Sequence, residues 1–535
     1  MSSANGRQDL SALGVQDLSA LGIQALVDPG KTPTDEQVRV IEAPRRPLLV
    51  VAGAGSGKTE TMSMRVLWLV ANHEDIAPSS VLGLTFTRKA AGELGDRLRQ
   101  RLALLAGRVP SLRERLDEDP VSLTYNSFAE RIVAEHGMRI GIDPDFTMLT
   151  EAGAVDLMTQ IVEGWPTDLD EDLSPSAAVG HCLHLAGEVG EHGYTVEEAR
   201  DALEGFGRDL EQIGATNDTA RKTLRANARR LAYLGPVEEF QRCKREGGLL
   251  DFSDQLVLAT RIVRGAPAVR AQVRDEFQAV LLDEFQDTSV IQMELLSLLF
   301  HDHAVTAVGD PNQAIYGWRG ASASSLERFL DRFQDGPAQP GQTLTLSTAW
   351  RNDRNILRAA NRVAAPLREH SRAAKSPVLR ARPGAGEGRV DVAYTQDYRS
   401  ALGAVVDFVS AHRSRGTREG KRPTTAVLCR RRSDFPYVDM ALREAGVPTQ
   451  IVGLGGLLDQ PSVQDARAAL VLADDVEASP WLARLLAGID LGAADLVALG
   501  DWARHLAREE GRDPHRAVLL DAVDNPPEPG WSASG

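Results

Sequence analysis

The sequence predicts an α/β fold in which a parallel sheet carries helices, followed by a second, partial α/β segment. Short apolar runs recur along the chain, each bounded by turn signals and followed by a helical pattern. This alternation is typical of a parallel sheet with crossover helices. At 535 residues the chain is too long for a single core, so we expect about three or four domains.

The composition is that of an ordinary soluble protein, with 43% hydrophobic and 25% charged residues. The N-terminus lacks the basic region and apolar stretch of a signal peptide, and no run is long enough to span a membrane. The three cysteines, Cys182, Cys243 and Cys429, lie too far apart for a disulfide framework or a zinc site. We therefore expect a cytoplasmic protein with buried free thiols and no membrane partner.

The net charge of −15 argues against non-specific coating of nucleic acid, but it does not exclude a local basic groove. Basic residues are concentrated at 88–115, against only three acidic residues. This run fits either a groove for an anionic partner or a solvated helix face, so it predicts no function by itself.

The ordered part of the chain is expected to begin near residue 33. Residues 1–32 contain a direct repeat, Gln8–Gly14 and Gln16–Gly22, which predicts a flexible tail or a short docking helix. Thr34 and Gln37 then have the spacing of a capping box, in which the two side chains satisfy the first amides of a helix.

The apolar run Leu48–Val51 predicts a buried strand that ends in a glycine-rich turn, with a helix from Glu60 to Val70 after it. Strand, turn and helix in this order are the context that a phosphate-binding loop requires. The glycines let successive amides point at phosphate oxygens, and the helix adds its positive end. The lysine can reach the β- and γ-phosphates, and the threonine hydroxyl can ligate Mg²⁺. The predicted nucleotide-binding residues are Ala52, Gly53, Ala54, Gly55, Ser56, Gly57, Lys58 and Thr59.

Two further strands and a helical insertion are expected downstream. The runs 82–87 and 121–124 each lead into a helix, at Arg88 and at Tyr125. From about 150 to 250 the pattern is polar and helical, and the strand pattern resumes only after it. This stretch is therefore predicted to be a helical insertion in the α/β domain.

An apolar run at 280–282 ends in two carboxylates, Asp283 and Glu284. Asp283 is expected to hold Mg²⁺, directly or through water, and Glu284 to orient and deprotonate the attacking water in phosphoryl transfer. Carboxylates after a strand are also common in solvated turns. The phosphate-binding loop upstream favours the catalytic interpretation.

The next strand, 304–308, leads into a segment that combines a glutamine with aromatic and basic residues. Gln313 can hydrogen-bond a γ-phosphate and the catalytic water. Tyr316, Trp318 and Arg319 follow in a glycine-flanked stretch, and aromatic rings beside an arginine form a platform for single-stranded bases. A tryptophan at such a place is usually just packed, but the nearby nucleotide site favours a stacked base.

The remaining elements continue the alternation. The expected order is a strand at 343–346, Arg351, a helix at 355–364, a Pro- and Gly-containing linker at 367–388, and strands near 389–394, 425–429 and 450–453. After about 475 the pattern is short and helical, and the last residues are predicted to be disordered.

Together these motifs resemble those of superfamily 1 DNA helicases of the UvrD/Rep/PcrA type, over roughly residues 33 to 475. The residues that carry the resemblance are Gln37, Ala52–Thr59, Thr85–Ala91, Thr124–Phe128, Leu250–Asp254, Asp283–Thr288, Val308–Gly320 and Trp350–Arg351. Within this group, Gly83–Leu94 and Thr306–Ser322 look most similar to the AdnB-type subunit of actinobacterial helicase–nuclease machines.

The resemblance implies two RecA-like domains, an ATP site and a path for single-stranded DNA. The implied ATP-site residues are Gln37 for adenine, Lys58 and Thr59 for phosphates and Mg²⁺, Asp283 and Glu284 for the metal and the water, and Gln313 and Arg351 for the γ-phosphate. The implied DNA-contacting residues are Phe86, Asn126, Tyr316, Trp318 and Arg319. ATP would close the cleft between the domains and move the strand 3′ to 5′.

The domains predicted from these observations alternate along the chain. They are a flexible extension (1–32), a first RecA-like ATP-binding domain (33–111 and 251–355), a helical insertion (112–250), a partial second RecA-like domain (356–475) and a helical segment with a disordered tail (476–535).

The chain also departs from the family pattern. Ala349-Trp350-Arg351 stands where the family has Asn-Tyr-Arg, and Asn126 stands where members often have His. The family's last two motifs, which supply a second γ-phosphate arginine, have no counterpart after Val463, and no nuclease motif is identifiable. We therefore expect a truncated motor.

The predicted function is an ATP-dependent 3′–5′ DNA helicase or translocase in repair or recombination, located in the cytoplasm at the nucleoid. Its expected cofactors are ATP and Mg²⁺, and its expected partners are single-stranded or partially duplex DNA and a second helicase–nuclease subunit. The alternative is a truncated module that binds ATP, DNA or a partner without efficient turnover, because losing a γ-phosphate arginine can cost about 10³ or more in rate. An ATPase that acts on protein or small molecules is disfavoured by the aromatic platform next to Gln313.

Overall fold

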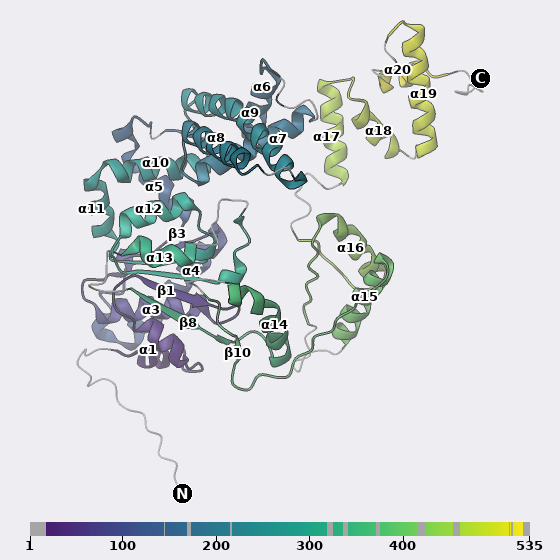
Figure 1. Cartoon of the computed structure of the whole chain (residues 1–535). Helices are drawn as coiled ribbons and strands as arrows, with labels where there is room; N and C mark the ends of the chain where they lie inside the picture. Colours follow the sequence, from purple (N-terminus) through teal and green to yellow (C-terminus); the bar gives the residue numbers. More distant parts are fainter. Residues whose placement is uncertain are drawn as a thin grey trace. The chain divides into compact units, whose positions relative to one another are not determined.

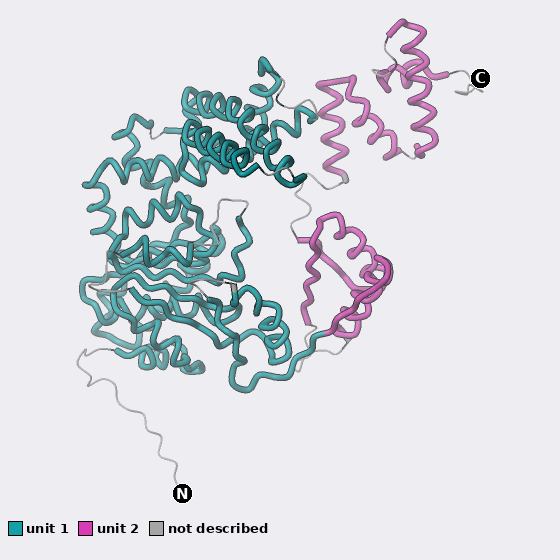
Figure 2. The backbone as a smooth tube through the Cα atoms, in the orientation of Figure 1, with its two compact units in different colours: residues 1–390 teal, residues 391–535 magenta. Residues whose placement is uncertain are grey.

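The structure is a computed structural model of the chain. It describes residues 18–143, 145–167, 169, 173–214, 217–317, 325–334, 341–370, 375–414, 423–452, 461–489, 491–512, 514 and 517–527. The chain divides into two compact units, residues 1–390 and 391–535 (Figure 2).

The first unit is built on a six-stranded parallel sheet with the strand order β3-β2-β6-β7-β1-β8 (Figure 1). Its strands are β1 (Leu48–Ala52), β2 (Val81–Thr85), β3 (Val121–Thr124), β6 (Ala279–Leu282), β7 (Val305–Gly309) and β8 (Gln342–Leu346). Val50 of β1 lies opposite Val308 on one side and Leu344 on the other. The strands lie where the apolar runs predicted them, and the predicted α/β class is confirmed.

Side chains of β1 alternate between the two faces of this sheet, and helices cover both faces. Leu49 and Val51 join one core, whereas Leu48, Val50 and Ala52 join the other. The first core includes α5 (Tyr125–His136), α10 (Phe252–Gly265), α11 (Pro267–Glu276), α12 (Val290–Phe300) and α13 (Ser325–Phe333). The second includes α1 (Ala20–Val27), α2 (Asp35–Ile41), α3 (Lys58–Asn72) and α4 (Arg88–Arg108). Burial on both faces explains why β1 is apolar along its whole length.

The N-terminal extension contains a docked helix, α1. It buries Ala20 and Ile23 in the second core, and the Ser19 side chain caps its first turn. The backbone of Leu18 exchanges two hydrogen bonds with the Asn72 side chain, at 2.7 and 2.9 Å. The docking-helix alternative therefore holds for residues 20–27, and the flexible extension predicted for 1–32 is wrong for them because their apolar side chains join the core. The first copy of the repeat lies outside the described residues.

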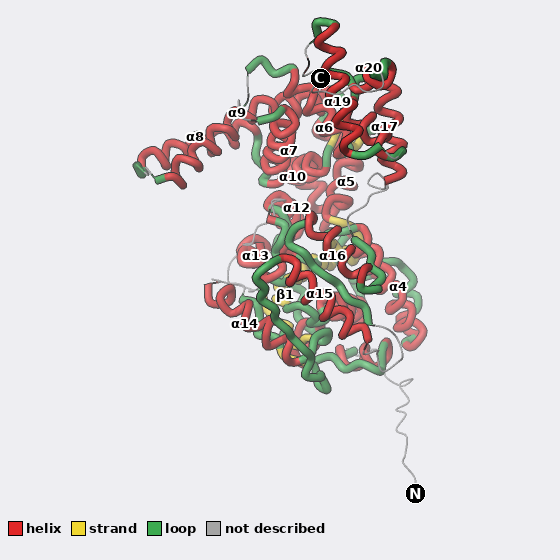
Figure 3. The backbone as a smooth tube through the Cα atoms, turned by 90° about the vertical axis from the view of Figure 1, so that its right-hand side faces the viewer, coloured by secondary structure: helices red, strands yellow, loops and turns green. Residues whose placement is uncertain are grey.

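A separate layer of helices follows β3 and α5. It comprises α6 (Glu151–Glu163), α7 (Pro175–Glu191), α8 (Val196–Gln212) and α9 (Asp218–Glu246), and it has its own core around Tyr233, Leu234 and Phe240. In Figure 3 these helices lie above the sheet of the same unit. β4 (Thr147–Met148) and β5 (Leu249–Leu250) pair where the chain enters and leaves this layer. The predicted start of the insertion at 112 therefore precedes β3 and α5, which belong to the sheet layer.

Beyond β8 the chain passes over the glycine-rich turn. β9 (Thr348–Ala349) pairs with β10 (Arg380–Ala381), and α14 (Arg354–His370) lies between them in the sequence. The carboxylate of Glu36 on α2 accepts hydrogen bonds from the backbone N–H and the hydroxyl of Ser347, both at 2.7 Å. These bonds fix the turn between β8 and β9 next to α2.

The second unit is helical in its described parts. It contains α15 (Tyr398–Ser414), α16 (Phe435–Glu444), α17 (Pro461–Asp474), α18 (Ser479–Ala487), α19 (Ala493–Glu509) and α20 (Leu519–Asp524). The strands predicted near 389–394, 425–429 and 450–453 are wrong for their described residues, none of which joins a ladder. Apolar side chains in these segments, such as Val392, Tyr394 and Leu428, remain exposed. A strand pattern in sequence produces a strand only where a hydrogen-bonded neighbour is available.

Candidate nucleotide and nucleic-acid site

The predicted phosphate-binding loop lies between β1 and α3. Gly55 and Gly57 have φ angles of +74° and +83°, which glycine adopts without strain. Within the part of the chain that the structure describes, no side chain caps the N-terminus of α3, so the first amides of the helix point to the loop uncapped. The Ser56 hydroxyl is buried and makes no hydrogen bond within the described residues. These donors are of the kind that a phosphate accepts from.

Lys58 reaches from the start of α3 to the end of β6. Its Nζ lies 2.8 Å from Oε2 of Glu284, and its side chain is only 12% exposed. The two residues are separated by 226 positions in the sequence and meet because parallel strands end at the same edge of the sheet. A triphosphate that binds in the loop has to compete with the Glu284 carboxylate for the Lys58 ammonium group.

The two carboxylates after β6 have different environments. Burial, followed by the nearby Glu284 charge, raises the pKa of Asp283 to about 6. Burial also acts on Glu284, but Lys58 and a hydrogen bond from Gln286 outweigh it and hold the pKa of Glu284 below its usual value. Glu284 has a left-handed backbone, with φ 49° and ψ 42°, a strained conformation of the kind found at functional sites. Asp283 is therefore the carboxylate that gains most from a nearby cation.

This donor set fits Mg²⁺ bound together with a nucleotide. Among the described residues, no cluster of three or more His, Cys, Asp or Glu side chains could hold a metal ion. Mg²⁺ prefers hard oxygen ligands and is usually bound by one or two protein groups plus substrate phosphates. The Asp283 carboxylate and the Thr59 hydroxyl, at the ends of β6 and of the loop, are such groups.

Gln37 lies against the loop and also completes a helix cap. It forms the capping box of α2 with Thr34, as the spacing predicted. Its Nε2 donates to the Thr61 hydroxyl on α3 at 3.2 Å. A Cβ at Gly57 would lie 3.0 Å from the same nitrogen. The contact of Gln37 with adenine stays a prediction.

Trp350 and Arg351 pass over the loop directly after β9. The backbone N–H of Trp350 donates to the Gly55 carbonyl at 2.8 Å, and Trp350 Cδ1 would lie 3.7 Å from a Cβ at Gly57. A Cβ at Gly55 would lie 3.0 Å from Cβ of Arg351. A role was predicted for Arg351 but none for Trp350. The Trp350 indole is partly exposed and lies, like Gln37, next to Gly57, so it can stack on a nucleotide base. In the sequence, only its position next to Arg351 indicates this role.

Gln313 is held near the carboxylates by a short hydrogen-bond network. Its Nε2 donates to Oδ2 of Asp310 at 2.8 Å. The backbone N–H of Asp310 donates to Oε1 of Gln286 at 3.0 Å, and Gln286 Nε2 donates to Oε2 of Glu284 at 3.0 Å. Gln286 is only 2% exposed. Gln286 was not predicted as a site residue, although its place between Glu284 and Asp287, just after a strand, is a signal that sequence alone offers.

Three of the predicted DNA-contacting residues lie in one region of the first unit. Phe86, directly after β2, stacks with Tyr316 at a centroid distance of 4.9 Å and an interplanar angle of 30°. Asn126, in the first turn of α5, accepts a hydrogen bond from Gln292 at 3.3 Å, and it lines the same pocket as Phe86. The other two, Trp318 and Arg319, lie outside the described residues.

The pocket beside Phe86 has a volume of about 350 Å³ and joins the sheet layer to the helical layer. Arg88 from α4, Phe252 from α10 and Asp287 after β6 contribute to its lining. Among the described lining residues Arg88 is the one basic side chain, beside three carboxylates that include Glu130 and Glu191, so the aromatic rings are the groups that best fit bases of single-stranded nucleic acid. Burial, followed by the Glu284 charge, raises the pKa of Asp287 to about 6.

The basic run at 88–115 proves to be divided between two roles. Arg101 pairs with Glu60 on α3, and Arg115 donates to two backbone carbonyls at the end of α3. These residues hold α3 in place. Arg88 instead lines the pocket beside Phe86. Two members of the run are therefore structural and one lies at the candidate nucleic-acid pocket, while Lys89, Arg99, Arg108 and Arg113 are exposed.

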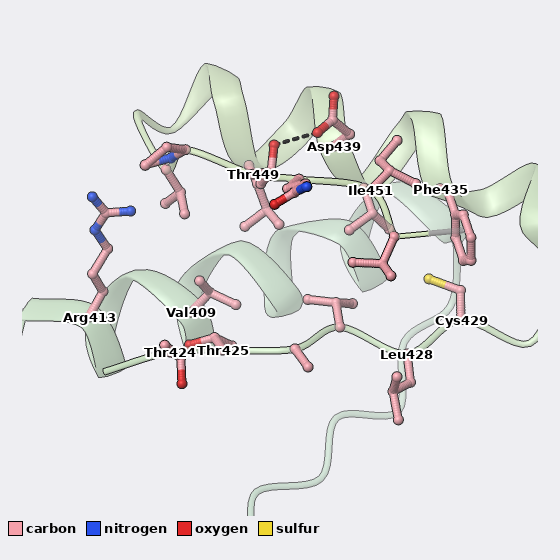
Figure 4. A pocket seen from close by; sticks show the side chains of 18 of the residues that line it. Val409, Arg413, Thr424, Thr425, Leu428, Cys429, Phe435, Asp439, Thr449 and Ile451 are labelled. Carbon is pink, nitrogen blue, oxygen red and sulfur yellow. Dashed lines mark hydrogen bonds between the residues drawn. The ribbon is translucent and has the colours of Figure 1, made fainter. Parts of the chain in front are cut away.

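The second unit has a pocket of its own, between α15, α16 and the segments 423–429 and 447–452 (Figure 4). Its volume is about 580 Å³, and aliphatic side chains dominate its lining. The carboxylate of Asp439 at this pocket accepts hydrogen bonds from Thr449 and Arg443. Among its described lining residues, Asp439 is the one carboxylate and Arg413 the one basic side chain. Within the described residues, every helix is too short or too polar to cross a membrane.

Comparison with known proteins places this site in a family. The profile of the UvrD/REP helicase N-terminal domain matches residues 33–334. DNA helicase II of Escherichia coli (strain K12) is 28% identical over 440 residues, which are 82% of this chain and 54% of that protein. ATP-dependent DNA helicase UvrD2 of Mycobacterium tuberculosis (strain ATCC 25618 / H37Rv) is 28% identical over 500 residues, 92% of this chain and 64% of that protein. ATP-dependent DNA helicase PcrA of Staphylococcus epidermidis (strain ATCC 12228 / FDA PCI 1200) is 26% identical over 438 residues, which are 81% of this chain and 53% of that protein. The chain thus spans little more than half the length of most of these relatives.

Proposed function

We propose that this chain, which belongs to the UvrD/REP helicase family, uses ATP hydrolysis to move along single-stranded DNA in the 3′–5′ direction. The observation that supports this most directly is the adjacency of two sites in one compact unit. Glu284 of the nucleotide site and Asp287 of the pocket beside Phe86 stand three residues apart, directly after β6. A change at one site is therefore transmitted through a few buried atoms to the other. The relatives named above as ATP-dependent DNA helicases share this region.

The residues of the nucleotide site act in a defined order. The phosphates of ATP enter the loop and draw Lys58 away from Glu284, which leaves the Glu284 carboxylate available to orient water and accept its proton. Gln37 and Trp350 flank the base. Gln313 and Arg351 approach the γ-phosphate, where donors stabilise the charge of the transition state. Mg²⁺, held by Asp283 and Thr59, supplies neutralisation of the phosphate charge when it is bound.

The pocket beside Phe86 suits a moving strand rather than a fixed sequence. The stacked pair Phe86 and Tyr316 presents π-faces, and every base can stack on such a face. Asn126 and Arg88 add polar groups for the sugar–phosphate backbone. A site that grips bases without reading them can release one nucleotide and take the next.

We further propose that the DNA is single-stranded or partially duplex and is met in repair or recombination at the nucleoid. A second helicase–nuclease subunit is the proposed protein partner, supported by the likeness of Gly83–Leu94 and Thr306–Ser322 to AdnB-type subunits. A second candidate function is binding of ATP and DNA without efficient turnover. It is favoured by the presence of a single identified γ-phosphate arginine, Arg351.

The test is ATP hydrolysis by the purified chain with and without single-stranded DNA, with Lys58→Ala as the control. The proposed motor shows turnover that DNA increases and that Lys58→Ala abolishes. ATP and DNA binding without turnover would instead support the second candidate. Absence of both binding activities would refute both.

A further inference from the structure

We propose that Gln286 is a positioning residue that couples the nucleic-acid pocket to the catalytic carboxylate Glu284. This inference rests on the proposed function and deepens it, because it names the group through which DNA controls hydrolysis. Gln286 lies on the three-residue link between the two sites. Its side-chain amide contacts a residue of each site, and its carbonyl oxygen contacts the segment of Gln313.

All the polar atoms of the Gln286 side chain are engaged. Its Nε2 donates to Oε2 of Glu284 at 3.0 Å and to Oδ2 of Asp287 at 3.1 Å. Its Oε1 accepts the backbone N–H of Asp310 at 3.0 Å. Because that backbone group can only donate, the orientation of the amide is fixed, and the –NH₂ group must face the two carboxylates. A buried amide held by charged acceptors on one side and a backbone donor on the other has little freedom to move independently of them.

The backbone at Gly309 makes this close approach possible. A Cβ at position 309 would lie 2.8 Å from Oε1 of Gln286, 2.8 Å from Cδ2 of Leu326 and 3.2 Å from the Gln286 backbone nitrogen. Contacts this short cannot be kept, so any larger residue at 309 would displace both the Gln286 amide and the Leu326 side chain. Gly309 ends β7 and leads to Asp310 and Gln313, the segment expected to meet the γ-phosphate.

On the nucleotide side, Gln286 and Lys58 share one oxygen atom of Glu284. Nζ of Lys58 lies 2.8 Å and Nε2 of Gln286 lies 3.0 Å from Oε2. When a triphosphate binds Lys58, the Lys58–Glu284 hydrogen bond is broken. Among the described residues, Gln286 is then the side chain that still donates to the Glu284 carboxylate. The position of Glu284 during hydrolysis is then set by whatever fixes the Gln286 amide.

On the nucleic-acid side, that fixing group is Asp287. Asp287 is 8% exposed, lines the pocket beside Phe86, and has a buried Oδ1 that makes no hydrogen bond within the described residues. The backbone amide of Ile315, next to the stacking residue Tyr316, lies close to the same carboxylate. A base that stacks on the outer face of the Phe86–Tyr316 pair therefore acts on the pocket that Phe86 shares with Asp287 and on the Ile315–Tyr316 segment beside it. The shared amide carries the change to Glu284.

The experiment compares variants of similar size in the full chain. Gln286→Met keeps the volume and removes the hydrogen bonds, whereas Gln286→Glu keeps the shape and replaces the donor by an acceptor. Gly309→Ala displaces the amide without changing it; because the new Cβ also meets Leu326, the melting temperature of this variant is measured beside its rates. Gln255→Met is the matched control, because Gln255 is a fully buried glutamine on α10 that lies outside both sites and donates to the Met148 sulfur.

The readouts are the turnover number at saturating single-stranded DNA, its ratio to the DNA-free rate, and the separate dissociation constants for DNA and a non-hydrolysable ATP analogue. We expect both Gln286 variants to lose about tenfold or more of the DNA-saturated rate, the size of one lost hydrogen bond to a charged group. The stimulation ratio falls towards one, the dissociation constants stay unchanged, and Gly309→Ala shifts the ratio in the same direction. Gln255→Met behaves as the unaltered chain.

If Gln286→Met keeps the full stimulation ratio, Gln286 only fills space and the inference is wrong. The inference would also be wrong if the Gln286 variants bound neither DNA nor the ATP analogue and had a lower melting temperature than Gln255→Met. That result would mean that Gln286 is needed for folding. Failure of the proposed function is distinct, because the unaltered chain itself would then show no DNA-stimulated hydrolysis.

Discussion

Replacing Glu284 by glutamine separates two interactions of Lys58, its ion pair with Glu284 and its predicted contact with the phosphates of ATP. In the structure Lys58 Nζ is 2.8 Å from the Glu284 carboxylate, and the two side chains are 12% and 38% exposed. A pair of this exposure contributes about 1 kcal/mol or less, so its loss frees Lys58 at small cost and should tighten ATP binding by at most about fivefold. Removal of the general base should lower the turnover number by about 10² to 10⁴.

The assay is equilibrium titration with a fluorescent ATP analogue, combined with single-turnover hydrolysis. Lys58→Ala is the comparison, because it removes the group that both the phosphates and Glu284 use and should weaken binding as well as turnover. The reasoning would be refuted if Glu284→Gln weakened ATP binding tenfold, or if it kept most of the hydrolysis rate. Weaker ATP binding would mean that Lys58 does not exchange Glu284 for the phosphates, and a retained rate would mean that Glu284 is not the general base.

Three other predictions follow from contacts in the first unit. Phe86→Ala or Tyr316→Ala should weaken single-stranded DNA binding by about 1 to 3 kcal/mol, measured by fluorescence anisotropy, with ATP binding unchanged, since one stacking partner is lost. Gly57→Ala should weaken ATP binding and lower the melting temperature, because a side chain at φ +83° costs about 1 to 2 kcal/mol and would meet Gln37, whereas Gly107→Ala, with no atom within 4 Å of the new Cβ, should do neither. The pKa of Asp287 is raised from 3.8 to about 6 in the folded state, which therefore binds the proton more tightly than the unfolded state. As the pH rises from about 4 to about 6, ionisation of this carboxylate lowers the stability of the folded state. Asp287→Asn should therefore raise the melting temperature of the first unit at pH 7.5, and the gain should vanish near pH 4; an equal gain at both values would refute the assignment.

The sheet and the loop were predictable because local sequence determines them. Leu48–Val51 is apolar on both faces, and only glycine suits the backbone of Gly55 and Gly57. Pattern and turn chemistry therefore located β1, the loop and α3 without knowledge of any distant residue. The acidic pair after β6 followed in the same way, since its signal is a strand with carboxylates at its end.

Other features depend on residues far apart in the sequence, which local patterns do not specify. The ion pair between Lys58 and Glu284 spans 226 positions, and Trp350 reaches the loop only because β8 and β9 return beside α2. The strand prediction at 425–429 failed for the same reason, since a ladder needs a partner that the segment itself does not encode. Gln286 looked like one polar residue among several until its three partners were placed.

We propose above all that ligand binding at the nucleotide site and at the nucleic-acid pocket of the first unit is energetically coupled. The most direct measurement is the dissociation constant of a single-stranded DNA oligonucleotide, determined by fluorescence anisotropy with and without a saturating non-hydrolysable ATP analogue. Coupled sites change each other's affinities by the same factor, which is typically about fivefold or more, and we expect a shift of that size. Equal affinities in the two conditions, with both ligands bound, would contradict the account.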